Sequence, residues 1–156
     1  MKFSKEVKTN DREIVIVRII DAPRELVFNA FIDPKHIAKW WGPRGFTNTI
    51  HEMDVRVGGY WRFIMHGPDG TDYTNWIKYL EIVKNELLVM DHGGNDPDKA
   101  EFHAVITFED DGLKTKLTMR SVFESPDALE AVKKFGAVEG GNQTLDKLAE
   151  FLAQQK

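Results

Sequence analysis

Five histidines are the residues of this chain best suited to acid–base or metal chemistry: His36, His51, His66, His92 and His103. None belongs to a helical HExxH motif or a His-x-His pair, and a metal site needs three or four converging ligands. We therefore expect no metal site. His92 is the first candidate for an acid–base group and Tyr73 the second. Asp91 adjoins His92 on a predicted strand and points to the opposite face, so no catalytic dyad is expected.

The composition excludes several other kinds of function. There are no cysteines, which excludes disulfides, cysteine-based zinc sites and thiol nucleophiles. A net charge of -4 argues against a nucleic-acid partner. The paired glycines at Gly58-Gly59 and Gly93-Gly94 lack the spacing of phosphate-binding loops, so no cofactor is expected.

Length and hydropathy predict one cytoplasmic domain. The 156 residues suit a single core, so we treat 1–156 as one domain whose first 11 residues form a flexible tail. The N-terminus lacks the apolar core of a signal peptide, and no stretch approaches the roughly 18 apolar residues of a spanning helix. We expect neither export nor membrane insertion, and the oligomeric state cannot be read from the sequence.

The first third of the chain predicts a strand followed by two short helices. A β-branched run at Glu13–Ile20 is typical of a strand. Residues 24–31 have apolar side chains three and four apart, which predicts a helix with one buried face. A second helix begins at Asp33-Pro34, with Asp33 as its N-cap, and ends at Trp40-Trp41-Gly42-Pro43.

Residues 48–122 alternate with a period of two between turn signals, which predicts a six-strand antiparallel meander. In its first hairpin, a three-residue turn at residues 58–60 would place six side chains on one face: Met53, Val55, Val57, Trp61, Phe63 and Met65. Later strands offer further inward candidates: Tyr73, Asn75, Ile77, Tyr79, Leu88, Met90, His92, Phe102, Ala104, Ile106, Phe108, Leu117, Met119 and Ser121.

After the meander, Ser125-Pro126 marks the start of a long C-terminal helix, with a bend expected within residues 136–141. The order of elements is an α+β layout, in which one curved antiparallel sheet of about seven strands encloses a terminal helix. The cleft between sheet and helix is the natural place for a ligand.

The predicted ligand contacts are the large inward side chains and a few polar ones. Pattern alone does not separate a packed core from a ligand-lined cavity, but scattered polar groups on inward faces favour a cavity. The candidates are Trp40, Trp41, Phe46, Trp61, Phe63, Met65, Tyr73, Asn75, Ile77, Tyr79, His92, Phe102 and Phe135.

These motifs together resemble the family named after the activator of the heat shock protein 90 ATPase, within the START/SRPBCC, Bet v 1-like superfamily. The matching stretches are Ala22-Pro23, Val27-Phe28-x-Ala30-Phe31, Asp33-Pro34, Trp40-Trp41-Gly42-Pro43, Asp54-x-Arg56-x-Gly58-Gly59-x-Trp61-Arg62, Pro68-Asp69-Gly70 and Gly140-Gly141-Asn142-Gln143-Thr144-Leu145-x-x-Leu148. The resemblance implies a helix-grip fold with a cavity. Many relatives have Gly-Trp where this chain has Gly140-Gly141, which implies a larger cavity here and adds Gly141 to the predicted ligand contacts.

We therefore expect a protein that binds a small hydrophobic or amphipathic molecule, such as a lipid, a polyketide-like compound or an aromatic compound, rather than an enzyme. Two alternatives stay open. One is a cyclase or hydrolase that uses the same cavity, with His92 or Tyr73 as acid–base group. The other is a chaperone-interaction module, which only the resemblance suggests.

Overall fold

The computed structural model describes residues 5–155 and consists of one curved sheet with four helices. The strands are β1 (Lys5–Thr9), β2 (Glu13–Ile20), β3 (Thr47–Met53), β4 (Tyr60–His66), β5 (Asp72–Val83), β6 (Leu87–Gly93), β7 (Ala100–Asp111) and β8 (Lys114–Phe123). The helices are α1 (Arg24–Ile32), α2 (Pro34–Trp40), α3 (Pro126–Lys134) and α4 (Ala137–Ala153).

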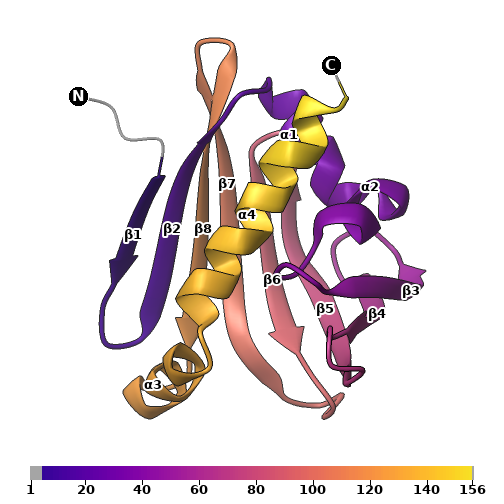
Figure 1. Cartoon of the computed structure of the whole chain (residues 1–156), viewed down its shortest axis with the longest axis vertical. Helices are drawn as coiled ribbons and strands as arrows, with labels where there is room; N and C mark the ends of the chain where they lie inside the picture. The colour runs from indigo at the N-terminus through magenta and orange to yellow at the C-terminus, as the bar shows by residue number, and fades with distance from the viewer. Residues whose placement is uncertain (1–4, 156) are drawn as a thin grey trace.

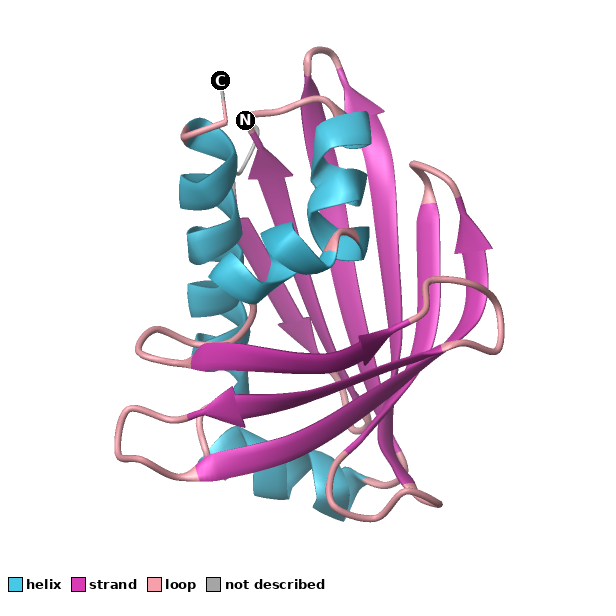
Figure 2. Cartoon of the chain, turned by 90° about the vertical axis from the view of Figure 1, so that its right-hand side faces the viewer, coloured by secondary structure: helices cyan, strands magenta, loops and turns pink. Residues whose placement is uncertain are grey.

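All neighbouring strands pair antiparallel, in the order β1-β2-β8-β7-β6-β5-β4-β3. The sheet curls around α4, which crosses its concave side (Figure 1). The helices all lie on that same side of the sheet (Figure 2). This arrangement confirms the predicted α+β class and helix-grip layout, with one strand more than expected. None of the described helices is long and apolar enough to cross a membrane.

The extra strand is β1, which corrects the flexible tail expected over residues 1–11. Lys5–Thr9 pairs with β2, in a register that places Lys5 opposite Arg18. The connecting turn is held by Asn10, whose Oδ1 accepts hydrogen bonds from the backbone N–H groups of Arg12 and Glu13 at 2.9 and 2.8 Å. Because the outer edge of β2 carries unpaired backbone groups, a polar segment can add a strand there without burying apolar side chains. Residues 1–4 lie outside the described part of the chain.

The predicted helix starts are confirmed by side-chain caps. The Oδ1 of Asp33 accepts the backbone N–H of Lys35 at 2.9 Å, and the Oγ of Ser125 accepts that of Ala128 at 3.1 Å. The C-terminal helical region is divided into two helices at Gly136, whose φ of 81° lies in the left-handed region that glycine adopts without strain.

The register predicted for the β3–β4 hairpin is wrong. Met53, not Val57, pairs with Trp61, and the connection spans the six residues 54–59. This loop docks on β5, because Gly58 donates its N–H to the carbonyl of Tyr79 at 2.7 Å. Val57 consequently leaves the sheet and is 60% exposed.

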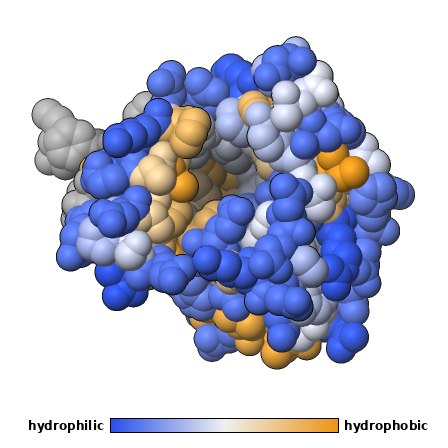
Figure 3. All heavy atoms as spheres, turned by 90° about the horizontal axis from the view of Figure 1, so that it is seen from below, coloured by the Kyte–Doolittle hydropathy of each residue, from blue (hydrophilic) through white to orange (hydrophobic). Residues whose placement is uncertain are grey.

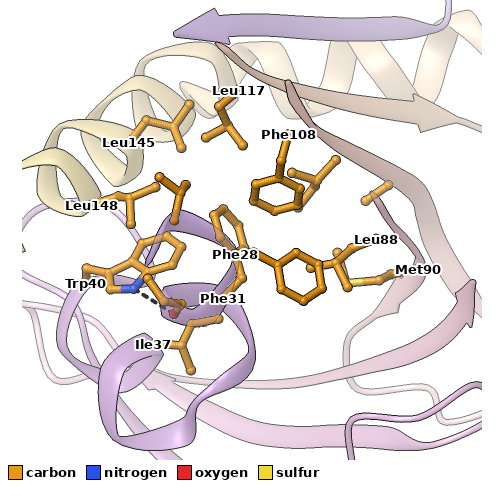
Figure 4. Close-up of a cluster of buried hydrophobic side chains, with 14 of the residues drawn as sticks. Phe28, Phe31, Ile37, Trp40, Leu88, Met90, Phe108, Leu117, Leu145 and Leu148 are labelled. Carbon is orange, nitrogen blue, oxygen red and sulfur yellow. Dashed lines mark hydrogen bonds between the residues drawn. The ribbon is translucent and has the colours of Figure 1, made fainter. Parts of the chain in front are cut away.

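A packed core occupies the end of the molecule where α1 and α2 lie against the sheet and α4 (Figure 4). Trp40 is fully buried, and its indole N–H donates to the carbonyl of Ala30 at 3.1 Å. Phe31 meets the rings of Trp40 and Phe108 edge to face, at centroid distances of 4.7 and 5.3 Å. Leu148 of α4 completes this cluster.

Helix α4 is held against β2 by Arg18, a nearly buried cation. Its Nη1 donates to Oδ1 of Asp146 at 2.8 Å, and its Nη2 donates to the carbonyl and Oδ1 of Asn142 at 3.4 and 3.2 Å. A buried guanidinium requires such partners, so these bonds determine where α4 sits on the sheet.

We expect Arg18→Ala to lower the free energy of unfolding by about 2 to 3 kcal/mol, since it removes charge-assisted hydrogen bonds and buried packing. Urea denaturation measures the loss. The matched control is Arg120→Ala, which removes an exposed arginine that lies 3.9 Å from Glu13. It should change stability by about 0.5 kcal/mol or less. Equal losses in the two variants would contradict the role given to Arg18.

Candidate ligand-binding cavity

A cavity of about 660 Å³ lies between the concave face of the sheet and helices α3 and α4. This volume falls within the range of about 300 to 1,000 Å³ that is typical of small-molecule sites. Its wall is largely apolar. The residues that line it from the sheet are Ile14, Ile16, Met65, Ile77, Met90, His92, Glu101, Phe102, Ala104, Ile106, Met119, Ser121 and Phe123, and those from loops and helices are Trp41, Gly42, Pro43, Lys99, Glu124, Ala128, Ala131, Val132, Phe135, Gly136, Ala137, Gly140, Gly141 and Thr144.

The cavity exists because the first half of α4 presents small residues to the sheet. Ala137, Gly140, Gly141 and Thr144 line it, whereas the second half of α4 presents leucines to the core. Gly141 also lets α4 approach β2, since a Cβ there would lie 2.7 Å from Cδ1 of Ile16. One helix therefore closes the core at one end and leaves space at the other.

The cavity opens to solvent beside α3. Viewed from below relative to Figure 1, the surface is hollowed, and apolar residues appear within a mainly hydrophilic surface (Figure 3). Among the lining residues, Lys99, Glu101, Glu124 and Phe135 are exposed, so they belong to the mouth. Phe135 follows the last turn of α3 and is 93% exposed.

The loop after α2 forms another wall and is tied to α4. The Nζ of Lys147 donates to the carbonyls of Gly42 and Pro43 at 3.1 and 3.3 Å. Burial, followed by the nearby charge of Arg44, lowers the pKa of Lys147. Arg44 in turn pairs with Glu150 on the exposed side of the helix. These contacts fasten the loop directly to α4.

His92 is the main polar group in the sheet wall. Its ring lies beside Phe102, at a centroid distance of 4.6 Å. Its Nε2 is 2.9 Å from Oδ1 of Asn75, and the Nδ2 of Asn75 donates to the carbonyl of Tyr73 at 3.0 Å. Burial lowers the pKa of His92 to about 4, so the imidazole is neutral at pH 7.

Half of the predicted ligand contacts lie in the cavity wall. They come from the loop after α2, from β4 to β7, and from the two C-terminal helices with their junction. These residues are Trp41, Met65, Ile77, His92, Phe102, Phe135 and Gly141. Their contact with a ligand stays a prediction.

Four other candidates lie in the packed interior instead: Trp40, Trp61, Phe63 and Tyr79 are each at most 1% exposed. Trp61 stacks on Phe63 with centroids 3.9 Å apart, and Trp41 covers Trp61 at 5.2 Å. Trp41 thus separates these rings from the cavity. Alternation identified their inward direction correctly but could not show that another aromatic ring would cover them.

The last three candidates, Phe46, Tyr73 and Asn75, lie outside the cavity wall. The rings of Phe46 and Tyr73 contact each other at a centroid distance of 5.9 Å, and Tyr73 is 46% exposed. Tyr73 is the second residue of β5. Asn75 contacts His92 and so acts on the cavity only through that ring.

Sequence reasoning missed the part of the wall built by β2, by α3 and by the small residues of α4 other than Gly141. Ile14 and Ile16 alternate with less buried residues along β2, but the neighbouring Val15 and Val17 are also apolar, so hydropathy could not have identified which face is buried. Met90, Ala104, Ile106, Met119 and Ser121 were predicted to face inward but not to line a site. The small helical residues gave no signal, because a missing side chain has no hydropathy pattern.

Two other histidines form pairs on the outer face of the sheet. His66 bridges Asp72 and Thr49, with both contacts at 2.7 Å, and His103 contacts Asp91 at 3.0 Å. Asp72, His66 and Thr49 follow the order of an acid–base–hydroxyl triad, but they are solvated side chains on an open sheet surface. Within residues 5–155, no group of three or more candidate ligands could hold a metal ion.

The lowered pKa of His92 predicts a specific loss of stability in acid. Above pH 6.5 the ring is neutral in both the folded and the unfolded chain. As the pH falls from 6.5 toward 4, the unfolded chain takes up the proton first, so stability decreases over this window. The limit is about 3 kcal/mol, and solvent in the cavity reduces it.

Urea denaturation at pH 7.5 and pH 5 measures this effect. Between these values the wild type should lose about 1 to 2 kcal/mol more than His92→Gln, because groups common to both proteins cancel in the comparison. The same pH dependence in both proteins would show that His92 is not held neutral by the fold.

Solved structures of bacterial proteins share this fold. The chain matches the solution NMR structure of a protein from Arthrobacter aurescens with a TM-score of 0.88 and 27% identity, over 96% of this chain and 91% of that one. It matches a crystal structure from Chromobacterium violaceum with a TM-score of 0.76 and 26% identity, over 90% and 96% of the two chains. A crystal structure from Mycobacterium smegmatis matches with a TM-score of 0.84 and 24% identity, over 94% and 95%.

Among curated proteins, none is significantly similar in sequence to this chain. The family model of the Activator of Hsp90 ATPase homolog 1-like proteins matches residues 21–153. That match extends from the end of β2 to the end of α4, and it includes both C-terminal helices that enclose the cavity. The chain therefore belongs to the family of Activator of Hsp90 ATPase homolog 1-like proteins.

Proposed function

We propose that this protein binds a small, mostly apolar molecule in the cavity between the sheet and helices α3 and α4. The observation that carries the proposal is the cavity itself, with its volume of about 660 Å³ and its apolar wall. Protein interiors are otherwise close-packed, with voids rarely larger than a water molecule. A lasting space of this size lowers stability, and an apolar ligand would recover the lost contacts.

The division of the interior also supports binding. The side chains of Trp40 and Phe31 are buried in the core and do not contribute to the cavity wall, so this part of the interior is packed without a ligand. Arg18 and Lys147 tie α4 to β2 and to the loop after α2, which fixes the position of the helix beside the cavity. A preformed apolar site binds without a large ordering penalty.

Proton-transfer catalysis in the same cavity is less well supported. A histidine whose pKa lies near 4 is a weak base at pH 7, far from the match of pKa and pH that general catalysis favours. Tyr73 does not line the cavity. The chaperone-interaction alternative draws on the family description alone, and absence of measurable binding to a purified chaperone would dismiss it.

Binding of a neutral apolar probe tests the proposal. We expect 2-methoxynaphthalene to bind with one-to-one stoichiometry and to change tryptophan fluorescence, because Trp41 lies in the wall. Isothermal titration calorimetry should show the negative heat-capacity change of apolar burial. Native mass spectrometry of protein purified from its host would identify any natural ligand that stays bound. Failure of the probe and of host lipid extracts to bind would sink the proposal.

A cavity-filling substitution tests the location of the site. Gly141→Trp places an indole between α4 and the sheet, next to Ile16 and Met119, and should weaken probe binding at least about tenfold through lost volume. Ala153→Trp is the matched control, since it adds the same indole at an exposed position of α4. Circular dichroism verifies folding, and Ala104→Phe provides a second filled cavity from the sheet side. Unchanged affinity in folded Gly141→Trp and Ala104→Phe would place the ligand elsewhere.

A further inference from the structure

The hydrogen bonds behind the cavity wall determine which ring nitrogen of His92 carries the proton. The Nδ2 of Asn75 lies 3.0 Å from the carbonyl oxygen of Tyr73, which can only accept. That contact orients the amide and turns its Oδ1 toward His92. Because Oδ1 is also an acceptor, the Nε2 of His92, 2.9 Å away, must be the donor.

The other ring nitrogen is therefore an unprotonated acceptor. Within the described chain, Nδ1 of His92 has no hydrogen-bond partner. Phe63, Ile77 and Phe102 lie beside the ring, and none of these three side chains carries a donor. Since His92 lines the cavity, a molecule inside it is the partner that Nδ1 can take.

The other uncharged polar side chains of the wall are placed differently. The hydroxyl of Thr144 donates to the carbonyl of Gly140 at 2.9 Å within α4, so its proton is already used. Ser121 lies on β8, two strands away from His92, and its hydroxyl can either donate or accept. The charged residues Lys99, Glu101 and Glu124 stay at the solvent-exposed mouth. The indole N–H of Trp41, which also lines the cavity, is a donor. Around His92 itself, the wall thus presents an acceptor beside the apolar side chains of Ile77 and Phe102.

From this geometry we propose that the ligand is a neutral, mostly apolar molecule with a hydrogen-bond donor, such as a phenol or an alcohol, which it directs to Nδ1 of His92. This inference rests on the proposed binding function and specifies its ligand class. A carboxylate at this point would face the lone pair of Nδ1 and lose its hydration, so fatty acids are selected against. The lowered pKa of His92 supports the same conclusion, because a neutral ring offers an acceptor.

The tautomer can be observed directly in the protein without ligand. Long-range ¹H–¹⁵N correlation spectra distinguish protonated from unprotonated imidazole nitrogens, and the spectrum of His92→Gln assigns the signals of His92 among the five histidines. We expect a neutral ring at pH 7 with its proton on Nε2. A proton on Nδ1, or a doubly protonated ring, would overturn the proposal.

Two probes of nearly equal shape then test ligand choice. 2-Naphthol carries a hydroxyl donor, and 2-methoxynaphthalene has a methyl group in its place. For each protein, calorimetry gives the affinity for 2-naphthol divided by the affinity for 2-methoxynaphthalene. We expect this ratio to be about five- to tenfold higher in the wild type than in His92→Phe, which keeps a ring without an acceptor. His103→Phe, on the outer face of the neighbouring strand, is the matched control and should keep the wild-type ratio.

The outcomes separate the two proposals. If both probes bind and the ratio is the same in the wild type and in His92→Phe, the donor preference is wrong and the binding function stands. If neither probe binds any of the three proteins, the binding function itself fails and the donor preference falls with it. Tighter binding of the 2-naphthoate anion than of 2-naphthol by the wild type would also overturn the proposal.

Discussion

The ionic contact between Arg18 of β2 and Asp146 of α4 is the constraint on which the interior depends. It lies between two environments along β2, since the buried side chain of Ile16 lines the cavity and that of Ile20 does not. A buried guanidinium tolerates little displacement from its partners, so it holds the helix at one height above the sheet. Leucines of α4 reach the core from that height, and the glycines nearer its start leave the cavity open.

The size of the cavity follows from side-chain volume on one helix rather than from any special backbone feature. At a given distance between α4 and the sheet, the side chain of each helix residue that faces the sheet either fills the space between them or leaves that space empty. Gly141 is the position where this choice matters most, because a Cβ there would already lie 2.7 Å from Cδ1 of Ile16. The polar character of the wall depends in a similar way on one neutral imidazole, whose orientation is set by Asn75 from outside the cavity.

Much of the fold could be predicted because its signals are local. Asp33 and Ser125 cap helices through bonds to residues two and three positions away, and alternation along the strands indicates inward faces. The N-terminal strand β1 was missed because edge pairing uses backbone groups and leaves little trace in side-chain hydropathy. The β3–β4 register was missed because the loop is docked by Tyr79, which lies about twenty residues further along the chain.

For the site, the sequence by itself determined the fold class, the inward faces of the strands and the presence of a histidine among apolar neighbours. Only the tertiary structure decided which inward residues meet a cavity. Trp41 and Trp61 look alike in sequence, yet the first lines the cavity and the second lies beneath it. The physical reason is that alternation gives the direction of a side chain, whereas its depth depends on what α4 and the loops place above it. The acceptor role of His92 depends likewise on its hydrogen bond with Asn75 on the neighbouring strand, which no local sequence pattern indicates.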